Sequence, residues 1–386
     1  MKYWRGYLAA AIFAVIGFAL MAYAQAHSVL VDMIYPYMTR MVITSLSNWS
    51  GVMNFSLWQV LLIGLFVALT ATVILMIVLR WNFFQWLGWV LAAISCIFML
   101  NTGLYGLNRY ASPLADDVRL EVSDYTVSEL NEATLYFRDQ ANRLAMEIGR
   151  DQQGQVNFGT FEDMAKQAGE GYTSLAYDQA ISVFAGSTAP VKKLGFGFLY
   201  GKTSGVTVAL TGEASVNPNV PDVALPFAMC KEMAHRMCIY SDADAAFAAY
   251  LAGTSNSSKA FQYSANLVAY IYCYNALKEI PTSTAQACAT QVDTGVNKLL
   301  RRDLEAYIDF FGDDDMAENN RAEIPESASA EDAPIHFSLY SNAADLLTNW
   351  YVEKFVVPLH VEEEAPFNPL DPTQVDLSGL VNAKKK

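Results

Sequence analysis

The chain has 386 residues and a net charge of −14 at pH 7, and 53% of its residues are hydrophobic. This length allows about two folded regions, and the hydrophobic content is higher than that of an ordinary soluble protein. An acidic chain is repelled by phosphate backbones, so we expect no nucleic-acid partner.

Three long segments near the N-terminus carry no charged residue: Gly6 to Val31, Phe55 to Leu79 and Trp81 to Asn108. Each exceeds the roughly 20 apolar residues that span the hydrocarbon core of a bilayer. We therefore predict a membrane region over residues 1–110, with transmembrane helices at about 6–26, 57–79 and 84–107. The lipid bilayer is the first partner that the sequence predicts.

The first apolar segment has a second interpretation, as a cleaved signal peptide. Lys2 and Arg5 form a basic start, and Ala24 to Ala26 resembles a small-residue cleavage site. The apolar run is longer than the roughly 7–15 residues of a signal peptide, which favours a membrane span. The positive-inside rule then places the N-terminus in the cytoplasm and the chain beyond Arg109 outside it. We expect a multi-pass protein of the cell membrane.

The segment between the first two spans, residues 28–57, is amphipathic and rich in Met, Tyr and Trp. Such aromatic residues favour the membrane interface, where we expect this segment to lie.

Residues 111–358 predict a mainly helical extracytoplasmic domain with a small β element. Apolar residues recur at helical spacing from Leu130 to Leu144, and the alternation in "GVTVAL" (205–210) predicts a short hairpin or edge strand. Helices follow over about 226–310. The acidic segment 311–334 predicts a flexible loop, residues 336–356 a further helix, and 359–386 a tail.

Four of the five cysteines fall in this domain: Cys230, Cys238, Cys273 and Cys288. An even number in an oxidising compartment indicates disulfides, although buried free thiols explain the same count. If Cys230 and Cys238 share one helix, about 12 Å of rise separates them, beyond the roughly 7 Å limit for a bridge. We expect any disulfide to join other pairs.

The stretch "CKEMAHRMC", residues 230–238, differs by one residue from the zinc-protease motif H-E-x-x-H. Glu232 holds the position of the general base and His235 that of the second zinc ligand, while Lys231 replaces the first histidine. A protonated lysine has no lone pair to give to a metal. On one continuous helix, Cys238 would extend the face shared by Lys231 and His235.

Asp244 is the acidic candidate for a further ligand, but a continuous helix would point it away from His235. A helix break near Ser241 would change this, because Ser241 and Asp244 resemble a capping box. Capping, an ion pair with Lys231 and metal ligation are the three interpretations of Asp244. Glu213, on or just after the predicted strand, is a candidate groove residue.

Several landmarks, in this order, resemble one bacterial family of membrane-anchored proteins of unknown function. They are "YPYMTR", "NFSLWQVLL", "YGLNRYASPL", "YTVSEL", "TGEASVNPNVPDVALPF", "KEMAH" and "DADAAFAAYLA", and they cover most of the chain. The family has three N-terminal spans and an external zincin-like domain. The resemblance implies that Glu232 matches its general base, His235 its second zinc histidine and Asp244 its acidic third ligand. Lys231, Cys238 and Ala246 depart from its pattern.

These departures, set against the resemblance, imply a catalytically inactive binding or scaffolding module at the cell envelope. Its ligand would be an envelope protein or a peptide, and it would hold no cofactor. Lys231 would be a cation surrogate that supplies the charge of the missing zinc. Two alternatives remain open. One is a zinc metallopeptidase that draws an altered ligand set from His235, Asp244, Cys238 and Glu213. The other is a purely structural membrane protein.

Overall fold

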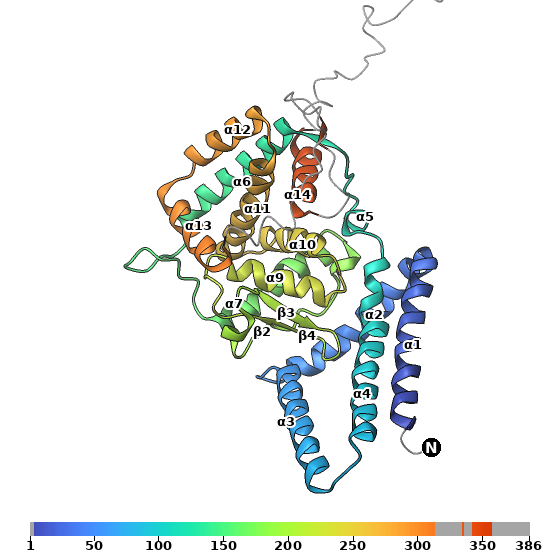
Figure 1. Ribbon diagram of the computed structural model, residues 1–386. Coiled ribbons are helices and arrows are strands. Elements are labelled where there is room, and N and C mark those ends of the chain that lie inside the picture. The colour runs from blue at the N-terminus through green and yellow to red at the C-terminus, as the bar shows by residue number, and fades with distance from the viewer. Residues whose placement is uncertain (1–3, 313–333, 336–341, 357–386) are drawn as a thin grey trace, which may run out of the picture.

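The computed structural model describes residues 4–312, 334–335 and 342–356 (Figure 1). The described chain is mainly helical, with three apolar helices near its N-terminus and a small three-stranded mixed sheet. These features confirm the fold class expected from the sequence. The predicted acidic loop and the tail fall almost entirely outside the described residues, as does the start of the predicted helix 336–356.

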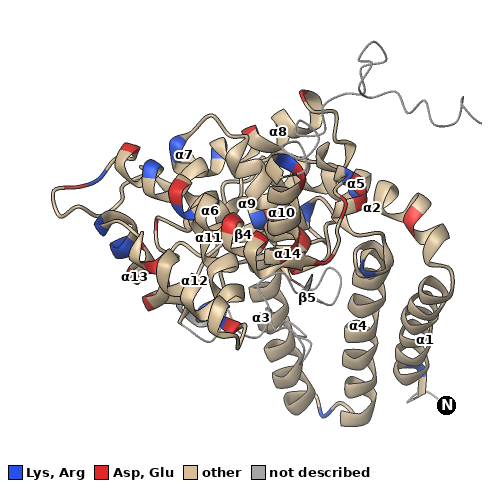
Figure 2. Cartoon of the chain, turned by 90° about the horizontal axis from the view of Figure 1, so that it is seen from above, with Lys and Arg blue, Asp and Glu red and all other residues tan. Residues whose placement is uncertain are grey.

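Three helices are long and apolar enough to cross a membrane: α1 (Trp4–Ala26), α3 (Leu57–Val78) and α4 (Phe83–Leu104). Figure 2 shows them almost free of charged residues, which gather over the rest of the molecule. Helices α1 and α4 pack closely, because a Cβ at Gly6 would lie 2.5 Å from the backbone of Gly88. The last span ends three residues before its predicted end, since a 3-10 turn occupies Gly106–Tyr110.

Helix α2 (Ser28–Gly51) occupies most of the segment between the first two spans and runs obliquely from α1 towards α3 (Figure 1). One of its faces is buried against the rest of the chain, with Thr39, Ile43 and Ser47 among its buried residues. Its opposite face is apolar and exposed. Helix α2 is therefore amphipathic, as the sequence predicts.

The sheet has the strand order β2-β4-β3. Strands β3 (Gly205–Val208) and β4 (Glu213–Val216) form an antiparallel hairpin, and β2 (Lys192–Lys193) runs parallel to β4 on its other side. The predicted hairpin is thus present, with β3 at the edge of the described sheet. A further short pair joins β1 (Tyr125–Thr126) to β5 (Pro334–Ile335).

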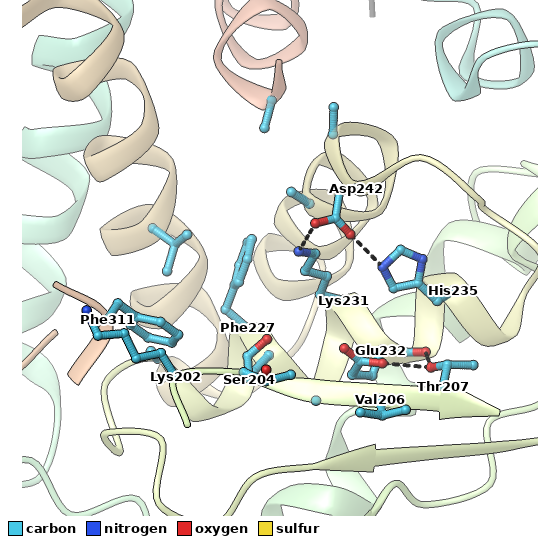
Figure 3. A pocket seen from close by; sticks show the side chains of 18 of the residues that line it. Lys202, Ser204, Val206, Thr207, Phe227, Lys231, Glu232, His235, Asp242 and Phe311 are labelled. Carbon is cyan, nitrogen blue, oxygen red and sulfur yellow. Dashed lines mark hydrogen bonds and ion pairs between the residues drawn. The ribbon is translucent and has the colours of Figure 1, made fainter. Parts of the chain in front are cut away.

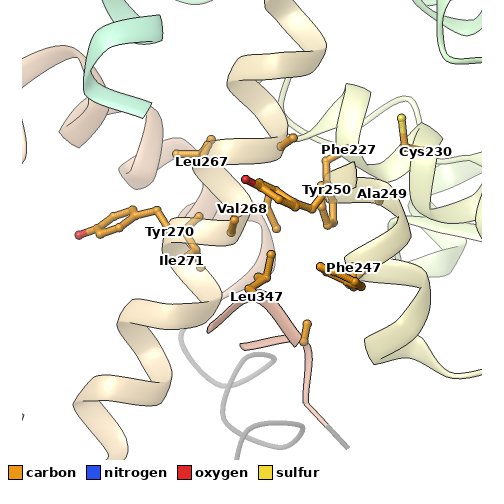
Figure 4. Close-up of a cluster of buried hydrophobic side chains, with 14 of the residues drawn as sticks. Phe227, Cys230, Phe247, Ala249, Tyr250, Leu267, Val268, Tyr270, Ile271 and Leu347 are labelled. Atoms are coloured by element: carbon orange, nitrogen blue, oxygen red, sulfur yellow. The ribbon is translucent and has the colours of Figure 1, made fainter. Parts of the chain in front are cut away.

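The larger part of the chain is a helical domain built on one hydrophobic core (Figure 4). Its principal helices are α6 (Val127–Glu147), α9 (Leu225–Arg236), α10 (Asp242–Thr254), α11 (Lys259–Glu279), α12 (Ser283–Thr294), α13 (Lys298–Phe311) and α14 (Ala343–Tyr351). Shorter helices are α5 (Leu114–Val118), α7 (Phe161–Gln167) and α8 (Gly169–Tyr177), and a π-helical turn, Val352–Val356, follows α14. Alanines on α10 let α9 and α11 pack closely against it.

The chain between α9 and α10 breaks where the sequence predicts it. Ser241 is the N-cap of α10, and its side chain accepts a hydrogen bond from the backbone N–H of Asp244. Helix α9, however, ends at Arg236, and Cys238 lies beyond it in the left-handed region with φ 71°. The expectation that Cys230 and Cys238 lie on one helix is therefore wrong, because the chain turns before Cys238.

Candidate functional site

A cavity of about 560 Å³ lies between the edge strand β3 and helix α9, and we refer to it as the cleft. Strand residues Ser204 to Thr207 form one wall, and Figure 3 shows Lys231, Glu232 and His235 projecting from α9 on the other. Asp242, at the start of α10, closes one end. The cleft therefore collects the motif residues that the sequence singled out, beside a strand edge.

Gly205 sets the distance between the two walls. A Cβ at this position would lie 2.5 Å from Cγ of Glu232 and 2.7 Å from the carbonyl oxygen of Ser215. Side-chain atoms cannot approach so closely without a shift of the backbone. The absence of a side chain at Gly205 thus lets α9 pack directly on β3.

Asp242 joins the two basic motif residues. Its Oδ2 lies 3.0 Å from Lys231 Nζ, and its Oδ1 lies 3.1 Å from His235 Nε2 (Figure 3). The side chain of Lys231 is only 17% exposed, whereas that of Asp242 is 64% exposed. A largely buried ammonium is therefore neutralised by a carboxylate at the solvent side of the cleft.

Both ring nitrogens of His235 face hydrogen-bond acceptors. Nδ1 lies 2.9 Å from the carbonyl oxygen of Ile239, and Nε2 faces the carboxylate of Asp242. Both nitrogens of His235 therefore face acceptors of the same chain and not open space.

The contacts of Asp242 and Lys231 determine the direction in which the pKa of each side chain shifts. The hydrogen bond from His235 and the charge of Lys231 hold the pKa of Asp242 well below its usual range, although partial burial opposes them. Burial lowers the pKa of Lys231, but Tyr272 and Asp242 outweigh it and raise the pKa above its ordinary value. Lys231 is therefore a fixed positive charge in the cleft.

The pKa of Glu232 is shifted in the opposite direction to that of Asp242. It is buried against β3, and burial raises the pKa of its carboxyl group although His235, Thr207 and Lys231 oppose the rise. Thr207 Oγ1 lies 2.7 Å from Glu232 Oε2 and 2.9 Å from the Glu232 carbonyl oxygen. The single hydroxyl hydrogen of Thr207 therefore faces two acceptors of Glu232, its carboxylate and its backbone carbonyl oxygen. The raised pKa makes this carboxyl group easier to protonate than that of an ordinary glutamate.

Asp244 does not reach the cleft. It lies two residues beyond Asp242 on α10, a rotation of about 200°, and it lines a second cavity on the other side of the helix. The interpretation of Asp244 as the partner of Lys231 is wrong, since Asp242 fills that role. Its interpretation as a capping residue matches the hydrogen bond from its N–H to Ser241, with the carboxylate pointing elsewhere.

Glu213 is not a groove residue, because it points away from the cleft towards the membrane helices. Its carboxylate accepts hydrogen bonds from the backbone N–H groups of Leu57 and Trp58, at 2.9 and 2.8 Å, and so caps the N-terminus of α3. Lys192 forms an ion pair with it at 2.7 Å, and both side chains are buried. The residue order of the hairpin was insufficient to show which face Glu213 occupies.

No disulfide joins any of the five cysteines. Cys230 is buried within the core, where burial raises its pKa to about 12. Cys238 faces α2, with Thr39 Oγ1 3.5 Å from its sulfur. Buried thiols, the second of the two interpretations of the cysteine count, are what the structure contains at Cys230, Cys238 and Cys273.

The cleft does not fit the zinc ion that the family resemblance implies. Asp244, Glu213 and Cys238 lie on other sides of the fold, the protonated nitrogen of Lys231 offers no lone pair, and Nε2 of His235 faces Asp242. Within the described residues, no three His, Cys, Asp or Glu side chains gather as metal ligands.

Asp242 and Thr207 are the site residues that sequence reasoning missed. Asp242 stands immediately after the predicted N-cap, where an acidic residue has a structural role of its own. The signal that could have revealed it is the helix break itself, because a turn between His235 and Ser241 folds the start of α10 back onto α9.

Comparison with curated proteins and with solved structures finds no match. A family of uncharacterised proteins matches residues 31–320, a range that begins in α2 and ends beyond α13. This match covers more than half of the chain and includes every residue of the cleft except Ala343. The chain therefore belongs to the family described as "Protein of unknown function (DUF3810)".

Proposed function

We propose that this multi-pass membrane protein presents a catalytically inactive, zincin-like cleft that binds an extended peptide segment of an envelope protein. Its N-terminus lies in the cytoplasm and its helical domain lies outside, as the positive-inside rule predicts. The observation that carries the proposal is the contact of Asp242 with both Lys231 and His235. An ammonium group takes the place that a metal ion would need.

The chemistry of the cleft supports binding rather than catalysis. Metal-assisted hydrolysis needs an ion with an open position and a carboxylate base. Lys231 carries its charge on a protonated nitrogen, which offers no lone pair, and burial raises the pKa of Glu232, which favours its protonated form. In this proposal the cleft keeps the residue positions of a zincin motif without the ligands that would hold the metal.

The strand edge supports an extended ligand. Strand β3 pairs with β4 along one side, and its other side borders the cleft from Ser204 to Thr207. An unpaired strand edge offers backbone N–H and C=O groups that an incoming segment can use by strand addition. Lys202 lines the same cleft and adds positive charge for acidic or carboxylate groups of the ligand, whereas the charge of Lys231 is paired with Asp242.

Metal analysis of the purified full-length protein tests the first half of the proposal. We expect no stoichiometric zinc in the wild type. Lys231→His should gain zinc, because it places a second imidazole beside His235 and Asp242 and so completes three ligands. The matched control is Lys202→His, in the same cleft but without these neighbours, and it should gain none. Stoichiometric wild-type zinc that His235→Ala removes would instead establish a metallopeptidase with an altered ligand set.

Peptide binding tests the second half. Random peptides displayed on phage, selected on the full-length protein, supply the probe. A photo-crosslinking residue placed at Lys202, at the rim of the cleft, should capture the selected peptides. The same residue at Lys166, an exposed position on α7, should not. Equal capture at both positions, or no selected peptide, contradicts the proposal.

A further inference from the structure

A second cavity, of about 340 Å³, lies where the membrane region meets the helical domain. Helix α2 contributes Asp32, Tyr37 and Arg40, and the segment after α4 contributes residues from Asn108 to Asp117. Residues of the turn between α9 and α10 also line the cavity, as does Asp244. We call this the junction cavity, and its volume is in the range of small-ligand sites.

Charged groups of both signs line the junction cavity, and Arg40 and Asp117 attract each other across it without direct contact. It contains the guanidinium groups of Arg40 and Arg109 and the carboxylates of Asp32, Asp117 and Asp244. Throughout the described part of the chain, none of these five residues forms an ion pair. Opposite charges held apart around one cavity match a ligand that carries both charges.

Two of these groups are fixed in place by the backbone. Arg40 donates from Nε to the carbonyl oxygen of Met237 at 3.1 Å, which leaves the outer edge of its guanidinium for another acceptor. Asp32 Oδ1 accepts from the N–H of Ser112 at 2.7 Å. The side chains of Arg40 and Asp32 are therefore held in position without a ligand.

The carboxylate of Asp244 indicates the chemistry of the ligand group that would bind beside it. It is only 7% exposed, and its Oδ1 is buried without a hydrogen-bond partner, although the backbone of Leu114 hydrogen-bonds the carboxyl group. Burial raises its pKa to about 6. A buried carboxylate oxygen without a donor is destabilising, and a ligand ammonium group would supply a donor to Oδ1 and a counter-charge.

The junction cavity lies at the depth of lipid headgroups. Asp32 follows the end of α1 by six residues, and Asn108 follows the end of α4 by four. The headgroup layer extends about 5–8 Å beyond the hydrocarbon core on each side of a bilayer. Both residues are therefore within reach of that layer.

The outward face of α2 supplies the apolar surface that acyl chains require. Val29, Met33, Tyr37 and Met41 recur every four residues on it and are 77, 73, 65 and 51% exposed. An exposed apolar stripe of this length marks an interaction surface. Tyr37 belongs both to this stripe and to the lining of the cavity, so the polar and apolar surfaces are continuous.

We propose that the junction cavity binds the headgroup of a phospholipid that carries a primary ammonium next to its phosphate, as phosphatidylethanolamine does. The ammonium lies towards Asp244 and the phosphate towards Arg40 and Arg109, while the acyl chains lie against the stripe on α2. Phosphatidylcholine lacks the N–H donors that Asp244 needs, and phosphatidylglycerol lacks the cation.

Lipid titration of the full-length protein in detergent tests this proposal. Native mass spectrometry counts bound lipid, and thermal scanning measures stabilisation. Phosphatidylethanolamine should bind roughly tenfold more tightly than phosphatidylcholine or phosphatidylglycerol, the effect of one charge-assisted hydrogen bond. Asp244→Asn should abolish the preference over phosphatidylcholine, and Arg40→Gln should weaken binding of both lipids. Asp309→Asn is the matched control, since this exposed residue of α13 does not line the cavity and should change nothing.

Two results would overturn the proposal. Equal binding of the three lipids, or an unchanged preference in Asp244→Asn, would show that the cavity does not select the ammonium group. If soluble phosphoethanolamine stabilises the protein as much as the lipid at equal concentration, the ligand is a free small molecule and not a membrane lipid. Neither result depends on whether the cleft binds metal or peptide.

Discussion

The two members of the Lys231–Asp242 ion pair lie in different surroundings, so their substitutions should have unequal costs. Asp242→Asn leaves the ammonium of Lys231, only 17% exposed, without its counter-charge. Removing one partner of a buried pair costs about 3–5 kcal/mol. We expect about 2–3 kcal/mol here, because the amide oxygen of asparagine still accepts a hydrogen bond.

Lys231→Met removes the buried charge instead. The remaining carboxylate of Asp242 is 64% exposed and keeps its contact with His235. Water solvates it, so the loss should be about 0–1 kcal/mol, the range of a surface pair. The double variant should resemble Lys231→Met, since it has no buried ammonium to strand.

Thermal scanning of the full-length protein at pH 7.5 distinguishes these outcomes. About 1 kcal/mol shifts the midpoint of a domain of this size by roughly 2–4 °C. Asp242→Asn should therefore lower the midpoint by about 4–12 °C and Lys231→Met by at most about 4 °C. Lys202→Met, the same substitution at an exposed position of the cleft, is the control. The reasoning is refuted if Lys231→Met is the more damaging single change, or if the two losses add in the double variant.

Acid should remove the contribution of Asp242. Its pKa in the folded protein is below the value of about 3.9 in an unfolded chain. The stabilisation is therefore fully present above that value and is lost as the pH falls through the folded pKa. The difference between wild type and Asp242→Asn should accordingly be constant from pH 5 to pH 7.5 and shrink in stronger acid.

Three further predictions concern other parts of the fold. Gly205→Ala should lower the thermal midpoint by the equivalent of about 1–3 kcal/mol, because its Cβ meets Glu232, whereas Gly64→Ala, with open space around it, should not. Burial raises the pKa of Asp244 to about 6, so its carboxyl group destabilises the lipid-free protein progressively as the pH rises from about 4 to 6. Asp244→Asn should therefore be more stable than wild type at pH 7.5 and equal to it near pH 4, as denaturation midpoints would show. Thiol titration of the denatured protein without reductant should count five thiols, and a lower count would contradict the structure.

The pattern of apolar and charged residues was sufficient to predict the membrane helices and the helical class of the domain. Uninterrupted apolar runs fixed α1, α3 and α4 to within three residues, and capping residues located the start of α10. These signals are local, since each depends on residues within one or two helical turns. The matched family range, 31–320, crosses the boundary expected at residue 110 and so includes parts of both regions.

The site was predictable only where its residues share one helix. Lys231, Glu232 and His235 lie together because helical spacing requires it. The partner of Lys231 depends on how α10 turns back onto α9. Asp242 and Asp244 lie at similar distances from Lys231 along the sequence, so the sequence does not show which of them contacts it. The direction of Glu213 depends on which face of the hairpin meets α3. Both contacts depend on tertiary packing, which cannot be inferred from a single sequence.

The membrane helices and the cleft share structural elements. Glu213 of β4 caps α3, and the indole N–H of Trp58 donates to Ser215 on the same strand at 3.0 Å. The adjacent strand, β3, forms a wall of the cleft, and Tyr105, at the end of α4, lines the same cleft. A fragment that begins after residue 110 would leave Glu213 without the N–H groups it caps. Strand β3 belongs to the hairpin that is bonded directly to α3, so a displacement of β3 would act on this membrane helix.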